Sequence, residues 1–96
     1  MHNEDEGIEF DPAKAAHNLA KHQVSFAHAE QALRDQFALT IEDPDSIDEA
    51  RFVTIGADSL GRILVVIHTP RAGRTRIISV RKASRRERRE YDAQGI

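Results

Sequence analysis

The side chains that could carry chemistry are three proton-transfer groups and three cations spread along the chain. The proton-transfer candidates are His22, His68 and Glu87, and the charge-stabilising candidates are Lys21, Arg51 and Arg81. This combination suits the cleavage of RNA without a metal ion. In that reaction a base removes the proton of the attacking 2′-hydroxyl, an acid protonates the leaving 5′-oxygen, and cations stabilise the phosphorane.

Each candidate also has a purely structural interpretation. Lys21 and His22 could simply end a helix, where cations are favourable. Glu87 could only cap a helix, and His68 could be a hydrogen-bonded histidine within a sheet. The residue types alone leave these alternatives open.

Other kinds of site lack the residues they need. The chain has no cysteine, which excludes disulfides and thiolate metal sites and suits a reducing cytosol. It has no Gly-rich phosphate loop, His-Glu-x-x-His pattern or nucleophile elbow. His17 and His22 are spaced five apart rather than four, and the acidic segment at 42–49 lacks the central glycine of a calcium loop. We therefore expect no metal and no cofactor.

Half of the positive charge lies near the C-terminus. Seven of the 14 Lys and Arg residues fall between Thr75 and Tyr91. The segment begins as a β-branched strand and continues into a helix that Ser84 and Glu87 start with a capping box. Arginines are unfavourable at the positive end of a helix dipole, so we expect phosphate or an acidic partner there rather than solvent alone. The RNA-contacting candidates are His68, Arg76, Arg85, Arg88 and Arg89.

The charge is divided unevenly between the two halves of the chain. Residues 1–50 hold 3 Lys/Arg and 12 Asp/Glu, whereas residues 51–96 hold 11 Lys/Arg and 4 Asp/Glu. Such asymmetry favours a polyanionic or charged protein partner. The alternative is internal neutralisation, in which the acidic half folds back on the basic half.

The hydrophobic pattern predicts an α+β fold. Helices are expected at 12–22, with Asp11 as N-cap and Ala15 and Leu19 as the buried stripe, and at 26–34, with Ser25 as N-cap. Asn18 is expected on the exposed surface of the first helix. Strands are expected at 37–41, 51–56, 62–69 and 75–81, with a further short strand at 8–10. The prediction is two N-terminal helices packed on a mostly antiparallel four-stranded sheet, with a short cationic C-terminal helix.

The length of 96 residues allows one core, so we expect a flexible tail at 1–7 and a single domain at 8–96. No stretch approaches the about 20 apolar residues of a membrane span, and the acidic N-terminus is unlike a secretory signal.

The hairpin between residues 62–69 and 75–81 predicts which side chains share a face. A loop of two or four residues places His68 with Ser79 and Arg81 on one face. The other face would be the apolar, helix-covered core. Its members would be Ile63, Val65, Ile67, Ile78 and Val80. A β-bulge would break this deduction.

Several segments of the chain follow a known pattern in order. They begin with Ile8-Glu9-Phe10-Asp11-Pro12-x-Lys14 and Asn18-Leu19-x-Lys21-His22-x-Val24-x-Phe26. They continue with Arg51-Phe52-x-x-Ile55-Gly56 and end with Ile77-Ile78-Ser79-x-Arg81-x-Ala83-x-x-x-Glu87-x-x-x-Tyr91. In these segments the sequence resembles the BrnT family of bacterial ribonuclease toxins of type II toxin–antitoxin systems. The chain departs from the family pattern at Gln23, where glycine is usual, and at Phe10, where tryptophan is common.

The resemblance implies a RelE-like fold and a ribonuclease that inhibits translation in the bacterial cytoplasm. It also implies a BrnA-type antitoxin with a ribbon–helix–helix region, through which the complex would bind operator DNA and repress its own operon. Carried over by position, the catalytic residues are Lys21, His22, Arg51, Arg81 and Glu87. The alternative function is a non-catalytic module that binds nucleic acid or protein through the cationic helix.

Overall fold

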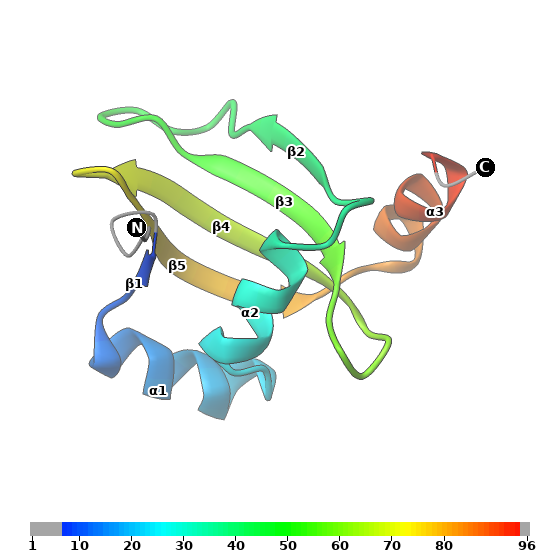
Figure 1. The fold of residues 1–96 in the computed structure, drawn as a ribbon, viewed down its shortest axis with the longest axis horizontal. Coiled ribbons are helices and arrows are strands. Elements are labelled where there is room, and N and C mark those ends of the chain that lie inside the picture. Colours follow the sequence, from blue (N-terminus) through cyan, green and yellow to red (C-terminus); the bar gives the residue numbers. More distant parts are fainter. Residues whose placement is uncertain (1–6, 95–96) are drawn as a thin grey trace.

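The structure, a computed structural model that describes residues 7–94, is an α+β fold in which two helices cover a five-stranded sheet (Figure 1). The elements in chain order are β1 (Ile8–Glu9), α1 (Pro12–His22), α2 (Phe26–Leu33), β2 (Leu39–Glu42), β3 (Phe52–Ala57), β4 (Ile63–Arg71), β5 (Arg74–Lys82) and α3 (Arg85–Gln94). The predicted class is therefore confirmed. The predicted tail at 1–7 lies outside the described residues except for Gly7, and the single domain at 8–96 stays a prediction.

The sheet has the strand order β1-β5-β4-β3-β2. β1 pairs with β5 in parallel, whereas the other three pairings are antiparallel. The prediction of a four-stranded sheet was one strand short. β1 has only two residues, too few to show a period, and its partner lies far along the chain. The RelE-like assignment within the α+β class stays a prediction.

The helices begin where the capping residues predicted. The Asp11 carboxylate accepts a hydrogen bond from the Ala13 amide at 2.9 Å, and the Ser25 hydroxyl accepts one from the His28 amide at 3.2 Å. α1 ends at Gln23, whose φ of 61° lies in the left-handed region. This is the conformation that most often places glycine at the end of a helix.

The buried side of α1 differs from the prediction. Leu19 is 51% exposed, whereas Asn18 is 4% exposed. The Asn18 side chain accepts a hydrogen bond from the Val80 amide at 3.0 Å and donates one to the Val24 carbonyl at 3.0 Å. The amide is buried because it satisfies backbone groups that neither a strand nor water reaches.

A β-bulge sets the faces of the β4–β5 hairpin. His68 pairs with Ile77, but the next residue back, Ile67, pairs with Ser79, which leaves Ile78 as the extra residue. The extra residue reverses the face assignment beyond it. In the predicted core set of Ile63, Val65, Ile67, Ile78 and Val80, only Val65 and Val80 are buried. Val80 alone belongs to the helix-covered cluster, so the prediction of the helix-covered face was wrong at the other four positions.

The observed core lies between α2 and the even-numbered face of β4. Its buried cluster consists of Val24, Phe26, Ala29, Ala32, Leu64, Val66, Ile77 and Val80. At Gly56 a Cβ would lie 2.2 Å from the Ala32 carbonyl oxygen, so only glycine lets α2 pack this close to β3. None of the helices within residues 7–94 is long and apolar enough to cross a membrane.

Candidate functional site

Arg81 and Glu87 form a two-point ion pair where β5 leads into α3. The two guanidinium NH groups donate to the two carboxylate oxygens, each at 2.8 Å. The Ser84 amide also donates to Glu87 at 2.8 Å, and the Glu87 amide donates to the Ser84 hydroxyl at 3.2 Å. The predicted capping box is thus confirmed. Glu87 fixes the start of α3 and the orientation of Arg81 at once.

These contacts set the ionisation of the pair. The Arg81 guanidinium, together with the Ser84 amide, lowers the pKa of Glu87 to about 2. The hydrogen bonds to Glu87 raise the pKa of Arg81 above its ordinary value. A general base works best when its pKa lies near the working pH, so Glu87 in this geometry is a poor proton acceptor. The arrangement suits the holding of a cation in a fixed position.

A pocket of about 490 Å³ lies between α1 and β5. We call it the α1 groove. Its lining includes Lys14, His17, Lys21 and His22 from α1, and Ile78 and Ser79 from β5. The groove therefore places Lys21 and His22, both predicted catalytic residues, beside the strand that carries Arg81.

Ser79 links the groove to the Arg81–Glu87 pair. Ser79 and Arg81 are two residues apart on β5, so their side chains lie on one strand face roughly 7 Å apart. The structure thus brings four of the five predicted catalytic residues onto neighbouring elements. These four are Lys21, His22, Arg81 and Glu87.

His68 lies on the other face of the sheet from Ser79 and Arg81, so the prediction that the three share a face was wrong. Its Nε2 shares a hydrogen bond with the Thr54 hydroxyl at 2.8 Å, and its ring stacks on Phe52 with centroids 6.0 Å apart. Burial lowers the pKa of His68 and so favours the neutral imidazole. The β-bulge at Ile78 causes the separation, because it reverses the β5 faces relative to β4.

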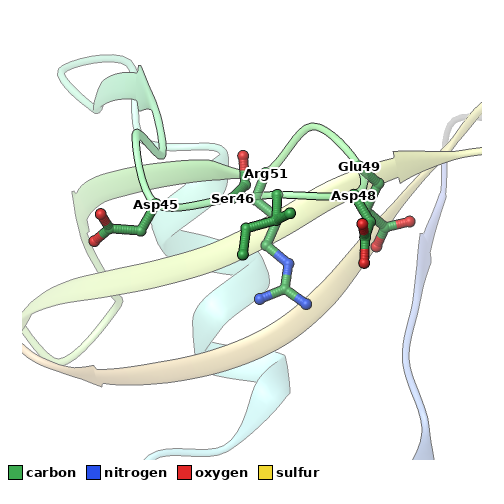
Figure 2. Close-up of a pocket in the computed structure, with 6 residues that line it drawn as sticks. Asp45, Ser46, Asp48, Glu49 and Arg51 are labelled. Carbon is green, nitrogen blue, oxygen red and sulfur yellow. The ribbon is translucent and has the colours of Figure 1, made fainter.

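Arg51 is separated from the other predicted catalytic residues along the sheet. It lines a pocket of about 340 Å³ with Asp45, Asp48 and Glu49 of the β2–β3 loop, and its side chain extends between these acidic groups (Figure 2). This loop and α3 lie at opposite ends of the sheet (Figure 1). Arg51 comes just before Phe52, which pairs with His68 of β4. Arg81 pairs with Val65 of the same strand. The two arginines therefore lie about 13 Å apart along the direction of β4.

The predicted RNA-contacting arginines are spread over two elements. Arg76 on β5 pairs with Glu9 of β1 at 3.4 Å. Arg85, Arg88 and Arg89 are exposed on α3, a helix with no buried residue. The structure therefore places the α3 arginines beside the Arg81–Glu87 pair and Arg76 at the far end of β5.

Comparison with known proteins bears on these elements directly. The family model described as the ribonuclease toxin BrnT of type II toxin–antitoxin systems matches residues 10–87. The chain belongs to the BrnT family. The ribonuclease toxin BrnT from Brucella abortus, known from a crystal structure, is 31% identical in sequence to this chain and superposes on it with a TM-score of 0.62. The match covers 83% of this chain and 99% of the Brucella chain. The comparison with curated proteins found no match.

BrnT membership gives the chain the role of a toxin in a type II toxin–antitoxin system, with an antitoxin as its partner. The matched span contains all five predicted catalytic residues and ends at Glu87. Arg88 and Arg89 follow this span. Their place on the exposed surface of α3 is thus a property of this chain that the family match does not cover.

The sequence did not predict the hydrogen-bond partner that anchors α3 beside the candidate site. The Tyr91 hydroxyl donates to the Asp35 carboxylate, which also accepts from the Ala57 amide at 2.9 Å. Burial, followed by the nearby Asp35 carboxylate, raises the pKa of Tyr91 to about 12. The Tyr91 contact joins residues 56 positions apart, and no local pattern could have predicted it.

A metal site has no obvious ligands in the part of the chain that the structure describes. No group of three or more His, Cys, Asp or Glu side chains converges within residues 7–94.

Proposed function

We propose that this chain is a ribonuclease toxin that cleaves RNA and thereby inhibits translation. The observation that supports this proposal is the α1 groove, where Lys21 and His22 lie beside Ser79, two residues from Arg81. Imidazole, ammonium and guanidinium groups together meet the needs of phosphodiester cleavage.

In the proposed reaction His22 takes the proton of the 2′-hydroxyl, whose oxygen then attacks the phosphorus. The bond to the 5′-oxygen breaks, and Lys21 supplies the proton that this leaving oxygen needs. Arg81 stabilises the extra negative charge of the phosphorane, and Glu87 holds its guanidinium in place. The products are a 2′,3′-cyclic phosphate and a free 5′-hydroxyl. No step calls on a metal ion.

Arg51 has a different role in this proposal. Its position at the far end of the sheet suits contact with RNA away from the scissile phosphate. The α3 arginines Arg85, Arg88 and Arg89 would contact RNA on the other side of the Arg81–Glu87 pair. Charged contacts of this kind position a nucleic acid without selecting its sequence.

The proposed partner is a BrnA-type antitoxin that carries a ribbon–helix–helix region. The complex would bind operator DNA through that region and repress its own operon in the bacterial cytoplasm. Expression of the chain alone should arrest growth, and co-expression of the neighbouring gene should restore it. Growth arrest that the neighbouring gene leaves unrelieved would contradict the pairing.

The decisive experiment is cleavage of a defined RNA by the purified chain, with and without a chelator. Wild type should cleave equally in both, and Arg81→Ala should lower kcat/KM roughly 100-fold because one charge-stabilising group is lost. Cleavage that requires a divalent metal would overturn the metal-free scheme. RNA binding without cleavage would favour the non-catalytic binding module instead. Undiminished toxicity of the double variant Arg81→Ala/Glu87→Ala would overturn the site.

A further inference from the structure

The α1 groove contains two basic residues that the proposed reaction leaves unused. Lys14 and His17 line the same groove as Lys21 and His22. We propose that the groove is a binding track for the backbone of a single RNA strand, with Lys14 and His17 as positioning residues beyond the scissile phosphate. This inference rests on the proposed ribonuclease function and adds a binding site to it.

The spacing on α1 suits a strand rather than a single anion. Lys14, His17 and Lys21 follow one another by three and four residues, so they form one stripe along the helix. At a rise of 1.5 Å per residue, Lys14 and Lys21 are roughly 10 Å apart along the axis. The two ammonium groups are therefore placed to contact different phosphates of one strand.

The charge of this stripe is available for a ligand. α1 contains no acidic residue, and within residues 7–94 no carboxylate lies within ion-pair distance of Lys14 or Lys21. By contrast, the β5 arginines Arg76 and Arg81 are paired with Glu9 and Glu87. The groove thus presents a positive surface that the described part of the chain leaves uncompensated. This surface complements the charge of RNA.

The groove is also preformed. Asn18, on the same helix, bonds the Val80 amide of β5 and the Val24 carbonyl, each at 3.0 Å, and is itself buried. The Val80 bond holds α1 against β5, so the helix that carries the cations is already in place before RNA binds. Preorganisation of this kind lowers the cost of binding.

The test measures binding apart from cleavage. The probe is a short single-stranded RNA with 2′-O-methyl groups, which cannot be cleaved because the nucleophile is blocked. Its affinity is measured by fluorescence anisotropy at several salt concentrations for wild type, Lys14→Ala/His17→Ala and Lys82→Ala. Lys82→Ala is the matched control, since Lys82 is the remaining lysine and pairs with Leu64 on the other face of β5 from Arg81.

We expect the groove variant to bind roughly five- to tenfold more weakly, with a salt slope reduced by about 0.7 for the lost lysine contact. With cleavable RNA its KM should rise while kcat stays the same, because uniform binding is lost. Lys82→Ala should behave as wild type. Alanine favours helix, so the circular dichroism of the groove variant should stay unchanged.

Unchanged RNA affinity of the groove variant, with cleavage by wild type intact, would overturn this inference alone. Unchanged RNA affinity combined with lost neutralisation by the antitoxin would assign the groove to a protein partner and would also overturn it. A wild type that neither binds the probe nor cleaves RNA would overturn the proposed function together with this extension.

Discussion

Glu87 accepts hydrogen bonds from the two terminal nitrogens of Arg81 and from the Ser84 backbone, so a single carboxylate joins a strand, a turn and a helix. The sequence left open whether this residue caps a helix or takes part in chemistry. The geometry shows that it caps, and that the same oxygens hold Arg81. A pKa of about 2 means that Glu87 stays charged in this arrangement across the physiological range.

This ion pair predicts a loss of stability in acid. The folded pKa of about 2 lies below the ordinary value of 4.5, so the charged form of Glu87 favours the folded state. Its contribution is complete above pH 4.5 and is lost as the pH falls toward 2. We expect about 1 kcal/mol, since Arg81 is half exposed and the pair is partly screened.

Urea unfolding at pH 5 and at pH 2.5 measures this contribution. Wild type should lose more unfolding free energy between the two pH values than Glu87→Gln does. Glu90→Gln is the matched control on the same helix, because Glu90 is 52% exposed and lies 3.6 Å from Arg86. Glu90→Gln should lose as much unfolding free energy between the two pH values as wild type does. Equal pH dependence of wild type and Glu87→Gln would show that the ion pair does not stabilise the fold in solution.

At the scale of the elements, α2 packs directly against β3 at Gly56. Gly56 allows this contact because its missing Cβ leaves room for the Ala32 carbonyl. Gly56→Ala should lower the free energy of unfolding by about 2–3 kcal/mol, since the new methyl group must push α2 away. Thermal and urea unfolding measure this loss.

Gly61 offers a matched comparison, because a Cβ there meets open space but φ is 80°. Gly61→Ala should cost only about 1 kcal/mol through backbone strain. A Gly56→Ala variant as stable as Gly61→Ala would mean that α2 shifts without cost.

The elements also differ in how well the sequence predicted them. Caps and alternation predicted α1, α2 and the three long strands, because these signals are local. The bulge at Ile78 could not be predicted, because it depends on the pairing of β4 with β5. The burial of Asn18 could not be predicted either, because it depends on how α1 meets β5. The same bulge places His68 on the other face of the sheet from Arg81, so the predicted shared face was wrong. The assignment of Lys21, His22, Arg81 and Glu87 as site residues stays a prediction.

At the scale of the whole molecule, the ion pairs that the structure describes form mostly within each half of the chain. Among residues 7–94, the ion pairs between arginine and carboxylate are local apart from Arg76–Glu9. Within these residues, Glu9 is therefore the one carboxylate of the acidic half that pairs with an arginine of the basic half. The acidic β2–β3 loop and the cationic α3 instead lie at opposite ends of the sheet (Figure 1).

This separation predicts that the acidic loop slows RNA association. The variant Asp45→Asn/Asp48→Asn/Glu49→Gln removes negative charge near Arg51 while leaving the core untouched. Its association rate with RNA at low salt should rise several-fold, and the difference should vanish near 1 M salt, where the screening length is about 3 Å. Stopped-flow fluorescence measures the association rate at low salt and near 1 M salt. An association rate that falls would instead give the loop a direct part in binding.

Asn18 has a consequence for how copies of this chain meet. β1 covers the outer edge of β5 only at Thr75 and Arg76, and beyond them the Asn18 side chain occupies the Val80 amide. An uncovered strand edge is a template on which another extended chain can add. One side-chain amide thus stands in for the missing length of β1. With the β5 side of the sheet partly covered by β1 and Asn18, the edge of β2 is the more open of the two sheet edges for strand addition.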